Sequence, residues 1–126
     1  MIIYISGAIT GLPNNNEAAF KDAHSRIANI AKVNKDFVKI KILNPIKIAA
    51  SLRSDFAKKN KGEPAWTDYM RVCIQKLCEA DCVFFLKDWA QSKGASLERH
   101  IAGRLDIPLA DNIDVLKEVI KRFVNS

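Results

Sequence analysis

The stretch Met1-Ile2-Ile3-Tyr4-Ile5-Ser6-Gly7-Ala8-Ile9-Thr10-Gly11 opens the chain and indicates its fold class. The segment Ile2–Ser6 is apolar on both faces, which is typical of a central parallel strand covered on both sides. It runs directly into a loop whose two glycines, Gly7 and Gly11, allow close backbone approach and positive φ, as a phosphate-cradling turn requires. Taken alone, such a loop is more often only a tight strand-to-helix turn.

Strand and helix patterns alternate after this opening. Further strands are expected at Val38–Leu43, Cys82–Leu86 and Ile107–Ala110, and helices at Asn16–Lys32, Pro64–Ala80, Lys93 onward and Ile113–Val124. Residues 50–63 show little apolar periodicity and predict a mobile loop with room for one short helix. The alternation predicts one α/β domain over residues 1–126. Its parallel sheet has an expected order of about 2-1-3-4, with room for a fifth strand and with helices on both faces.

Apolar residues recur at helical spacing in each predicted helix, so each helix has an expected buried face. These faces comprise Phe20, Ala23, Ile27 and Ile30; Trp66, Tyr69, Met70, Cys73 and Leu77; Gly94, Glu98, Ile101, Ala102 and Leu105; and Ile113, Leu116, Ile120 and Phe123. Asn16 is the expected N-cap of the first helix. Lysines alternate with isoleucines in Val38–Leu43, which indicates an edge strand with one side in water.

One member of these faces, Glu98, is a carboxylate in a row that faces the core. Burying a carboxylate without a partner costs several kcal/mol, roughly. We interpret Glu98 either as a functional residue or as a structural one. In the structural case it lies at the rim, or it pairs with Arg71 or Arg99.

The expected strand order places two loops together, because ligands of such sheets bind beyond the carboxyl ends of the strands, where the winding reverses. These loops are Gly7–Gly11 and Lys87–Gly94, and the second leads directly to Glu98. In the second loop Trp89 is suited either to close over a ring-shaped ligand or to plug the loop. Ser92 offers a hydroxyl to a ligand or caps the next helix.

The composition is that of a soluble globular protein. The net charge of +6 favours anionic partners, but the lysines are scattered without interleaved aromatic residues, so duplex nucleic acid is not expected as a partner. The N-terminus lacks the pattern of a signal peptide and no run is long enough to span a bilayer, which predicts a cytoplasmic location and no membrane partner. Cys73, Cys78 and Cys82 are expected to be buried free thiols, since Cys78 and Cys82 with His100 match no zinc spacing.

Four motifs strongly resemble small uncharacterised proteins allied to the nucleoside 2-deoxyribosyltransferases. They are Tyr-Ile-Ser-Gly-Ala-Ile-Thr-Gly from Tyr4, Trp-Thr-Asp-Tyr-Met-Arg from Trp66, Leu-Cys-Glu-Ala-Asp from Leu77, and Trp-Ala-Gln-Ser-Lys-Gly-Ala-Ser-Leu-Glu from Trp89. The resemblance covers nearly the whole chain apart from residues 47–63. It implies a flavodoxin/Rossmann-like fold and an enzyme of the superfamily that cleaves or transfers N-glycosidic bonds.

The resemblance also implies roles for individual residues. Glu98 stands where the family's nucleophile attacks the anomeric carbon of the sugar, and Tyr4 matches the tyrosine that helps to hold nucleophile and sugar. Ser92 resembles the serine that faces the 5′-phosphate in the monophosphate-cleaving branch. Cys73 stands where active enzymes have the Asp that protonates the leaving base, and Asp68, five residues earlier, replaces that Asp only if the helix is displaced.

The first loop also departs from the monophosphate-cleaving branch, because Ala8 and Thr10 stand where that branch has Ser and Arg. Any phosphate must therefore be held by backbone amides, Ser6, Ser92 or a lysine such as Lys93.

We therefore expect a deoxynucleoside or nucleoside 5′-monophosphate as substrate, with no cofactor and no metal. The expected substrate-binding residues are Ser6, Gly7, Ala8, Gly11, Trp89, Ser92, Gly94 and Ala95, beside the catalytic Glu98 and Tyr4. A homo-oligomer is expected by analogy, because related enzymes complete their sites with a neighbouring subunit. The alternatives are a nucleotide-binding or sensing protein that has lost turnover through Cys73, and a structural protein with Glu98 paired in the core.

Overall fold

The computed structural model describes residues 1–9, 13–33 and 39–126. Its strands all run parallel and form one sheet of order β2-β1-β3-β4. The strands are β1 (Ile2–Ser6), β2 (Lys41–Leu43), β3 (Cys82–Phe85) and β4 (Leu109–Ala110). This order confirms the prediction of 2-1-3-4, with β1 and β3 in the centre, and no fifth strand lies in the described parts of the chain.

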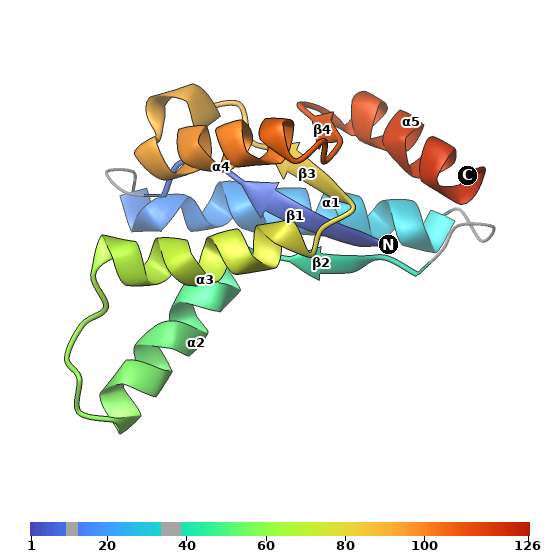
Figure 1. Ribbon diagram of the computed structural model, residues 1–126. Coiled ribbons are helices and arrows are strands. Elements are labelled where there is room, and N and C mark those ends of the chain that lie inside the picture. The colour runs from blue at the N-terminus through green and yellow to red at the C-terminus, as the bar shows by residue number, and fades with distance from the viewer. Residues whose placement is uncertain (10–12, 34–38) are drawn as a thin grey trace.

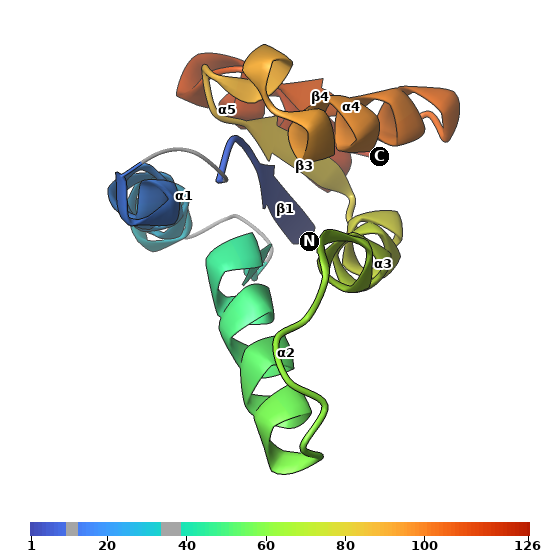
Figure 2. The same ribbon diagram turned by 90° about the vertical axis from the view of Figure 1, so that its left-hand side faces the viewer.

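Helices cover both faces of this sheet (Figures 1 and 2). One face carries α1 (Glu17–Val33) and α5 (Ile113–Val124), and the other carries α3 (Trp66–Cys78) and α4 (Lys93–Arg104). Two short 3-10 helices, η1 (Pro13–Asn16) and η2 (Trp89–Gln91), precede α1 and α4. The architecture is the predicted α/β, Rossmann-like arrangement. No helix of the described residues combines the length and apolar character needed to cross a membrane.

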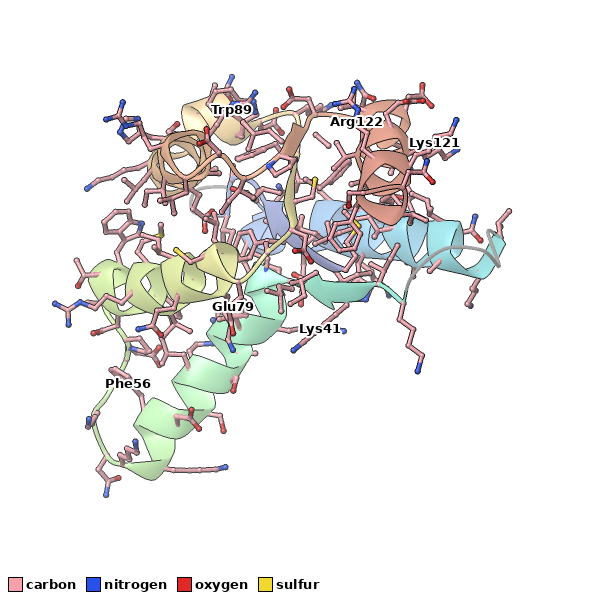
Figure 3. The ribbon with its side chains drawn as sticks, turned by 45° about the vertical axis from the view of Figure 1, so that its right-hand side comes forward. Lys41, Phe56, Glu79, Trp89, Lys121 and Arg122 are labelled. Carbon is pink, nitrogen blue, oxygen red and sulfur yellow. The ribbon has the colours of Figure 1, made fainter. Side chains whose placement is uncertain are left out.

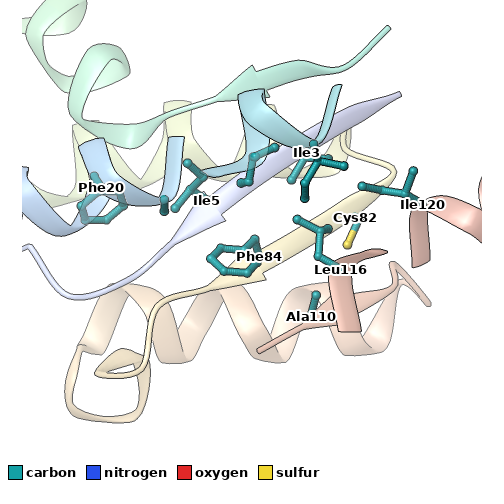
Figure 4. Packing of buried hydrophobic residues seen from close by; sticks show 11 residues of the cluster. Ile3, Ile5, Phe20, Cys82, Phe84, Ala110, Leu116 and Ile120 are labelled. Atoms are coloured by element: carbon teal, nitrogen blue, oxygen red, sulfur yellow. The ribbon is translucent and has the colours of Figure 1, made fainter. Parts of the chain in front are cut away.

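The central strands divide their side chains between two cores, because successive residues of a strand point to opposite faces. Ile3 and Ile5 pack with Phe84 against α1 and α5, in the cluster drawn in Figure 4. Tyr4 packs with Phe85 on the α3 and α4 face. The odd and even positions of β1 therefore serve different sides of the molecule.

The buried faces of the helices agree with the prediction in their middle turns and differ at their ends. All four expected residues of α1 are buried. Trp66, Leu105 and Phe123 are exposed instead, at 38%, 54% and 36%. Each lies in or beside a terminal turn, and a helix of about twelve residues extends further than strands of two to five residues can cover. Asn16 does not cap α1, since it has a φ of 59° and its Nδ2 donates to the Ala8 carbonyl at 2.9 Å.

The predicted loop at residues 50–63, with room for one short helix, is wrong in extent, because the 14-residue helix α2 (Pro45–Lys58) begins before it and occupies most of it. Asn44 caps this helix by accepting a hydrogen bond from the Ile46 backbone N–H at 3.0 Å, and Pro45 starts it. The helix leans away from the sheet (Figures 1 and 2), Phe56 lies near its outer end (Figure 3), and among its residues only Pro45 is buried. Its apolar residues Ile48, Leu52 and Phe56 recur at four-residue spacing and are half-buried, so α2 has an apolar stripe that the expectation of little periodicity missed.

Candidate functional site

Glu98 lies in the second turn of α4 and is only 5% exposed. The helix begins after Ser92, whose Oγ accepts a hydrogen bond from the Ala95 backbone N–H at 3.1 Å. Burial excludes the position at the rim. The guanidinium of Arg99 pairs with Asp111 at 2.7 Å, and Arg71 is exposed on α3. Glu98 therefore has neither of the expected arginine partners.

The partners of Glu98 are two hydroxyl groups of β1. The Tyr4 hydroxyl donates to Oε2, and the Ser6 hydroxyl donates to Oε1 at 2.8 Å. Tyr4 and Ser6 are two residues apart and so project from the same face of the strand, toward α4. The Ser6 hydroxyl, expected to hold phosphate, is used instead to hold Glu98, and both carboxylate oxygens are oriented by uncharged donors.

Burial raises the pKa of Glu98 to about 7, and the hydrogen bonds from Tyr4 and Ser6 offset part of this rise. The carboxyl is therefore close to half ionised at neutral pH. Burial and the neighbouring Glu98 raise the pKa of Tyr4 well above its usual value, so its hydroxyl keeps its proton and stays a donor. Glu98 is therefore the group of this site that titrates near neutral pH.

Cys73 reaches this site from α3. Its side chain is buried beside Tyr4 in the α3 and α4 core and interacts with the Tyr4 hydroxyl. Burial raises the pKa of the thiol to about 11, so it stays protonated. Asp68 is used elsewhere, because its Oδ2 accepts a hydrogen bond from the Ala65 backbone N–H at 2.8 Å and caps α3.

Met70 and Gly94 lie one turn closer to the helix N-termini than Cys73 and Glu98. A Cβ added at Gly94 would lie 3.2 Å from the Met70 sulfur, so the missing side chain lets α3 and α4 approach. Beside them, the Lys93 ammonium lies 4.3 Å from the centroid of the exposed Trp66 ring. These residues lie at the N-terminal ends of α3 and α4, one turn before Cys73 and Glu98. Met70 was not among the residues expected at the site, although it lies three residues before Cys73 and so on the same face of α3.

Trp89 packs against the end of β3 and against α4, as the interpretation of a loop plug expects. Its ring lies 5.9 Å from that of Phe85 in an edge-on arrangement, and the Arg99 guanidinium lies 4.2 Å from its centroid (Figure 3 labels Trp89). Arg99 also binds Asp111 with both terminal nitrogens. These contacts of Arg99 join α4 to Trp89 of η2 and to Asp111, which lies just before α5.

The first loop contributes backbone rather than side chains. A Cβ added at Gly7 would lie 2.6 Å from the Leu86 side chain, so only glycine fits between β1 and the end of β3. Ala8 is buried next to it. The expected binding residue Gly11 lies outside the described residues.

Other candidate groups are dispersed. Cys73 and Cys82 are buried as expected, whereas Cys78 is exposed because it lies on the outer side of the last turn of α3. Among the described residues, no three His, Cys, Asp or Glu side chains come together in a way that could hold a metal ion.

A family model described as "Domain of unknown function (DUF4406)" matches residues 1–111. No curated protein and no solved structure matches the chain.

Proposed function

The chain belongs to the family of the domain of unknown function DUF4406, and from its site we propose that it cleaves or transfers the N-glycosidic bond of a deoxynucleoside or nucleoside 5′-monophosphate. Glu98 is the nucleophile. The proposal is supported by the motifs that resemble the nucleoside 2-deoxyribosyltransferase superfamily. It depends above all on one observation: Glu98 is a buried carboxylate held by two hydroxyls and, within the described parts of the chain, by no cation.

Hydroxyl donors suit a nucleophile better than a lysine or arginine would. They fix the orientation of the carboxylate, and each oxygen keeps a further lone pair. A full positive charge would lower the nucleophilicity of the carboxylate and the pKa at which it ionises. A pKa of about 7 provides both an ionised carboxylate and one that is more basic than an exposed glutamate.

In the proposed reaction, an oxygen of ionised Glu98 attacks the anomeric carbon of the sugar. The bond between this carbon and the base nitrogen breaks, and its electron pair leaves with the base, which takes up a proton. Water or a second base then attacks the same carbon and releases Glu98, so the configuration is retained overall. Tyr4 and Ser6 hold Glu98 throughout and are positioning residues.

Protonation of the leaving base is the step that the site supports least. The thiol of Cys73 has a pKa of about 11 and is a weak acid compared with a carboxylic acid. This observation favours a second candidate function, in which the protein binds a nucleotide through the same site without turning it over.

One experiment separates the two functions. The protein is incubated with a panel of deoxynucleosides and their 5′-monophosphates, with and without a second free base, and released or exchanged base is measured by chromatography. We expect base release that rises with pH through about 7 as Glu98 ionises. The Glu98→Gln variant should lose this release by several orders of magnitude while keeping its fold, roughly.

Melting temperatures with the same panel provide the contrast. A compound that stabilises the protein without any base release supports the binding function and contradicts the enzyme. Base release that Glu98→Gln retains would show that another group carries the reaction.

A further inference from the structure

A cavity lies away from Glu98, on the side of the sheet that α1 covers. It has a volume of about 960 Å³ and lies between the first turns of α1 and the start of α2. Its lining includes the apolar Phe20 and Ile46 and the polar Asn16 and Asn44. Neither Glu98 nor its partners Tyr4 and Ser6 line it, so any ligand here is independent of the function proposed above.

The charged groups around the cavity favour an anion. Lys21 and Lys47 both line it and are exposed, and Glu17 is the one acidic residue among its lining. His24 also lines it, and burial together with the nearby Lys47 lowers the pKa of its imidazole. The histidine is therefore neutral at neutral pH, and the two lysines leave the cavity with a net positive charge.

His24 also has an unused polar atom. Its Nδ1 is shielded from solvent and has no hydrogen-bond partner among the described residues. Leaving a buried polar atom unpaired is unfavourable, and most such atoms in proteins have a protein or water partner. This shielded atom does not face the open cavity, so a ligand there lies beside the ring of His24 without bonding to this atom.

We propose that this cavity binds a small organic anion. Its phosphate or carboxylate group contacts Lys21 and Lys47, and the half-buried side chain of Ile46 contacts its carbon atoms. The cavity is large enough for a metabolite of this kind, since ligand sites commonly span about 300–1,000 Å³.

The test uses proton NMR, because the chain has only two histidines and the other, His100, lies on α4 as an internal reference. Glycerol 3-phosphate and citrate are titrated separately as phosphate and carboxylate probes. We expect the His24 ring signal to shift saturably with one of them, while that of His100 stays in place. The bound anion should also raise the pKa of His24, because its negative charge opposes the effect of Lys47.

Two variants make the test specific. Lys47→Gln should weaken binding of the probe at least about five-fold, whereas Lys58→Gln, the same change at the other end of α2, should leave it unchanged. Both side chains are exposed, so both variants should fold. The proposal is overturned if neither probe gives a saturable shift of His24, if His100 shifts equally, or if the two variants weaken binding to the same extent.

Discussion

The pH dependence of stability provides a direct test of the buried carboxylate. Replacing Glu98 by Gln keeps the shape of the side chain and removes its ability to ionise. The hydroxyls of Tyr4 and Ser6 rotate to accept as well as donate, so both keep a partner in the variant. The two proteins should therefore differ chiefly in the free energy of ionising one buried carboxyl.

The magnitude follows from the pKa of Glu98, which rises from 4.5 to about 7 on folding. Between these pH values the folded state binds more protons than the unfolded state, so the free energy of unfolding falls as the pH rises. The contribution of Glu98 to stability is fully present below pH 4.5 and is lost completely above about pH 7. At about 1.4 kcal/mol for each pH unit, the whole interval corresponds to about 3 kcal/mol.

Urea denaturation measures this loss. We expect the wild-type protein to lose about 3 kcal/mol relative to Glu98→Gln between about pH 5 and about pH 8. Glu118→Gln, which removes an exposed carboxylate from α5, should follow the wild-type curve. Parallel curves for wild type and Glu98→Gln would refute the reasoning, because they would mean that Glu98 titrates in solution as an exposed side chain does.

Three further predictions concern the surroundings of this carboxylate. Tyr4→Phe removes a hydrogen bond that lowers the pKa of the nucleophile, so the pH–rate profile should move upward by roughly one pH unit, and Tyr69→Phe should not move it. Cys73→Asp supplies a carboxylic acid and should increase the rate of base release about ten-fold or more, while lowering the free energy of unfolding by about 1–3 kcal/mol. An unchanged rate in a folded variant would mean that another group protonates the base. Arg99→Ala breaks an ion pair and two aromatic contacts, so it should lower the free energy of unfolding, measured by thermal denaturation, by about 1–2 kcal/mol. An equal loss in Arg104→Ala would contradict the stabilising role of these Arg99 contacts.

The features set by local pattern were predictable from the sequence. Fully apolar runs identified β1 and β3 as central strands, and the alternating β2 segment indicated an edge, which together determined the strand order. Helical spacing identified the buried face of α1 and placed Glu98 in the core. Each of these depends on residues within a few positions of one another.

Features that depend on distant contacts were not predictable in the same way. Ser6 was expected to bind a ligand, and only the pairing of β1 with α4 shows that its hydroxyl holds Glu98. Trp89 left two interpretations open, and its packing against Phe85 and Arg99 could not be predicted from local pattern. The helix α2 was not predicted, although Ile48, Leu52 and Phe56 recur at four-residue spacing, because this stripe is short and lies among charged and polar residues.

The two hydrogen bonds of Glu98 join residues that are 94 and 92 positions apart in the chain. Contacts at such separation close a long loop at an entropic cost, so the site forms only when β1 and α4 come together. Until α4 docks, Glu98 stays in water and is fully ionised at neutral pH. After docking, about half of the Glu98 side chains are protonated at this pH, so the step should take up about half a proton per chain from the solvent. A pH indicator in weakly buffered refolding solution would show the docking of α4 as a lasting rise in pH.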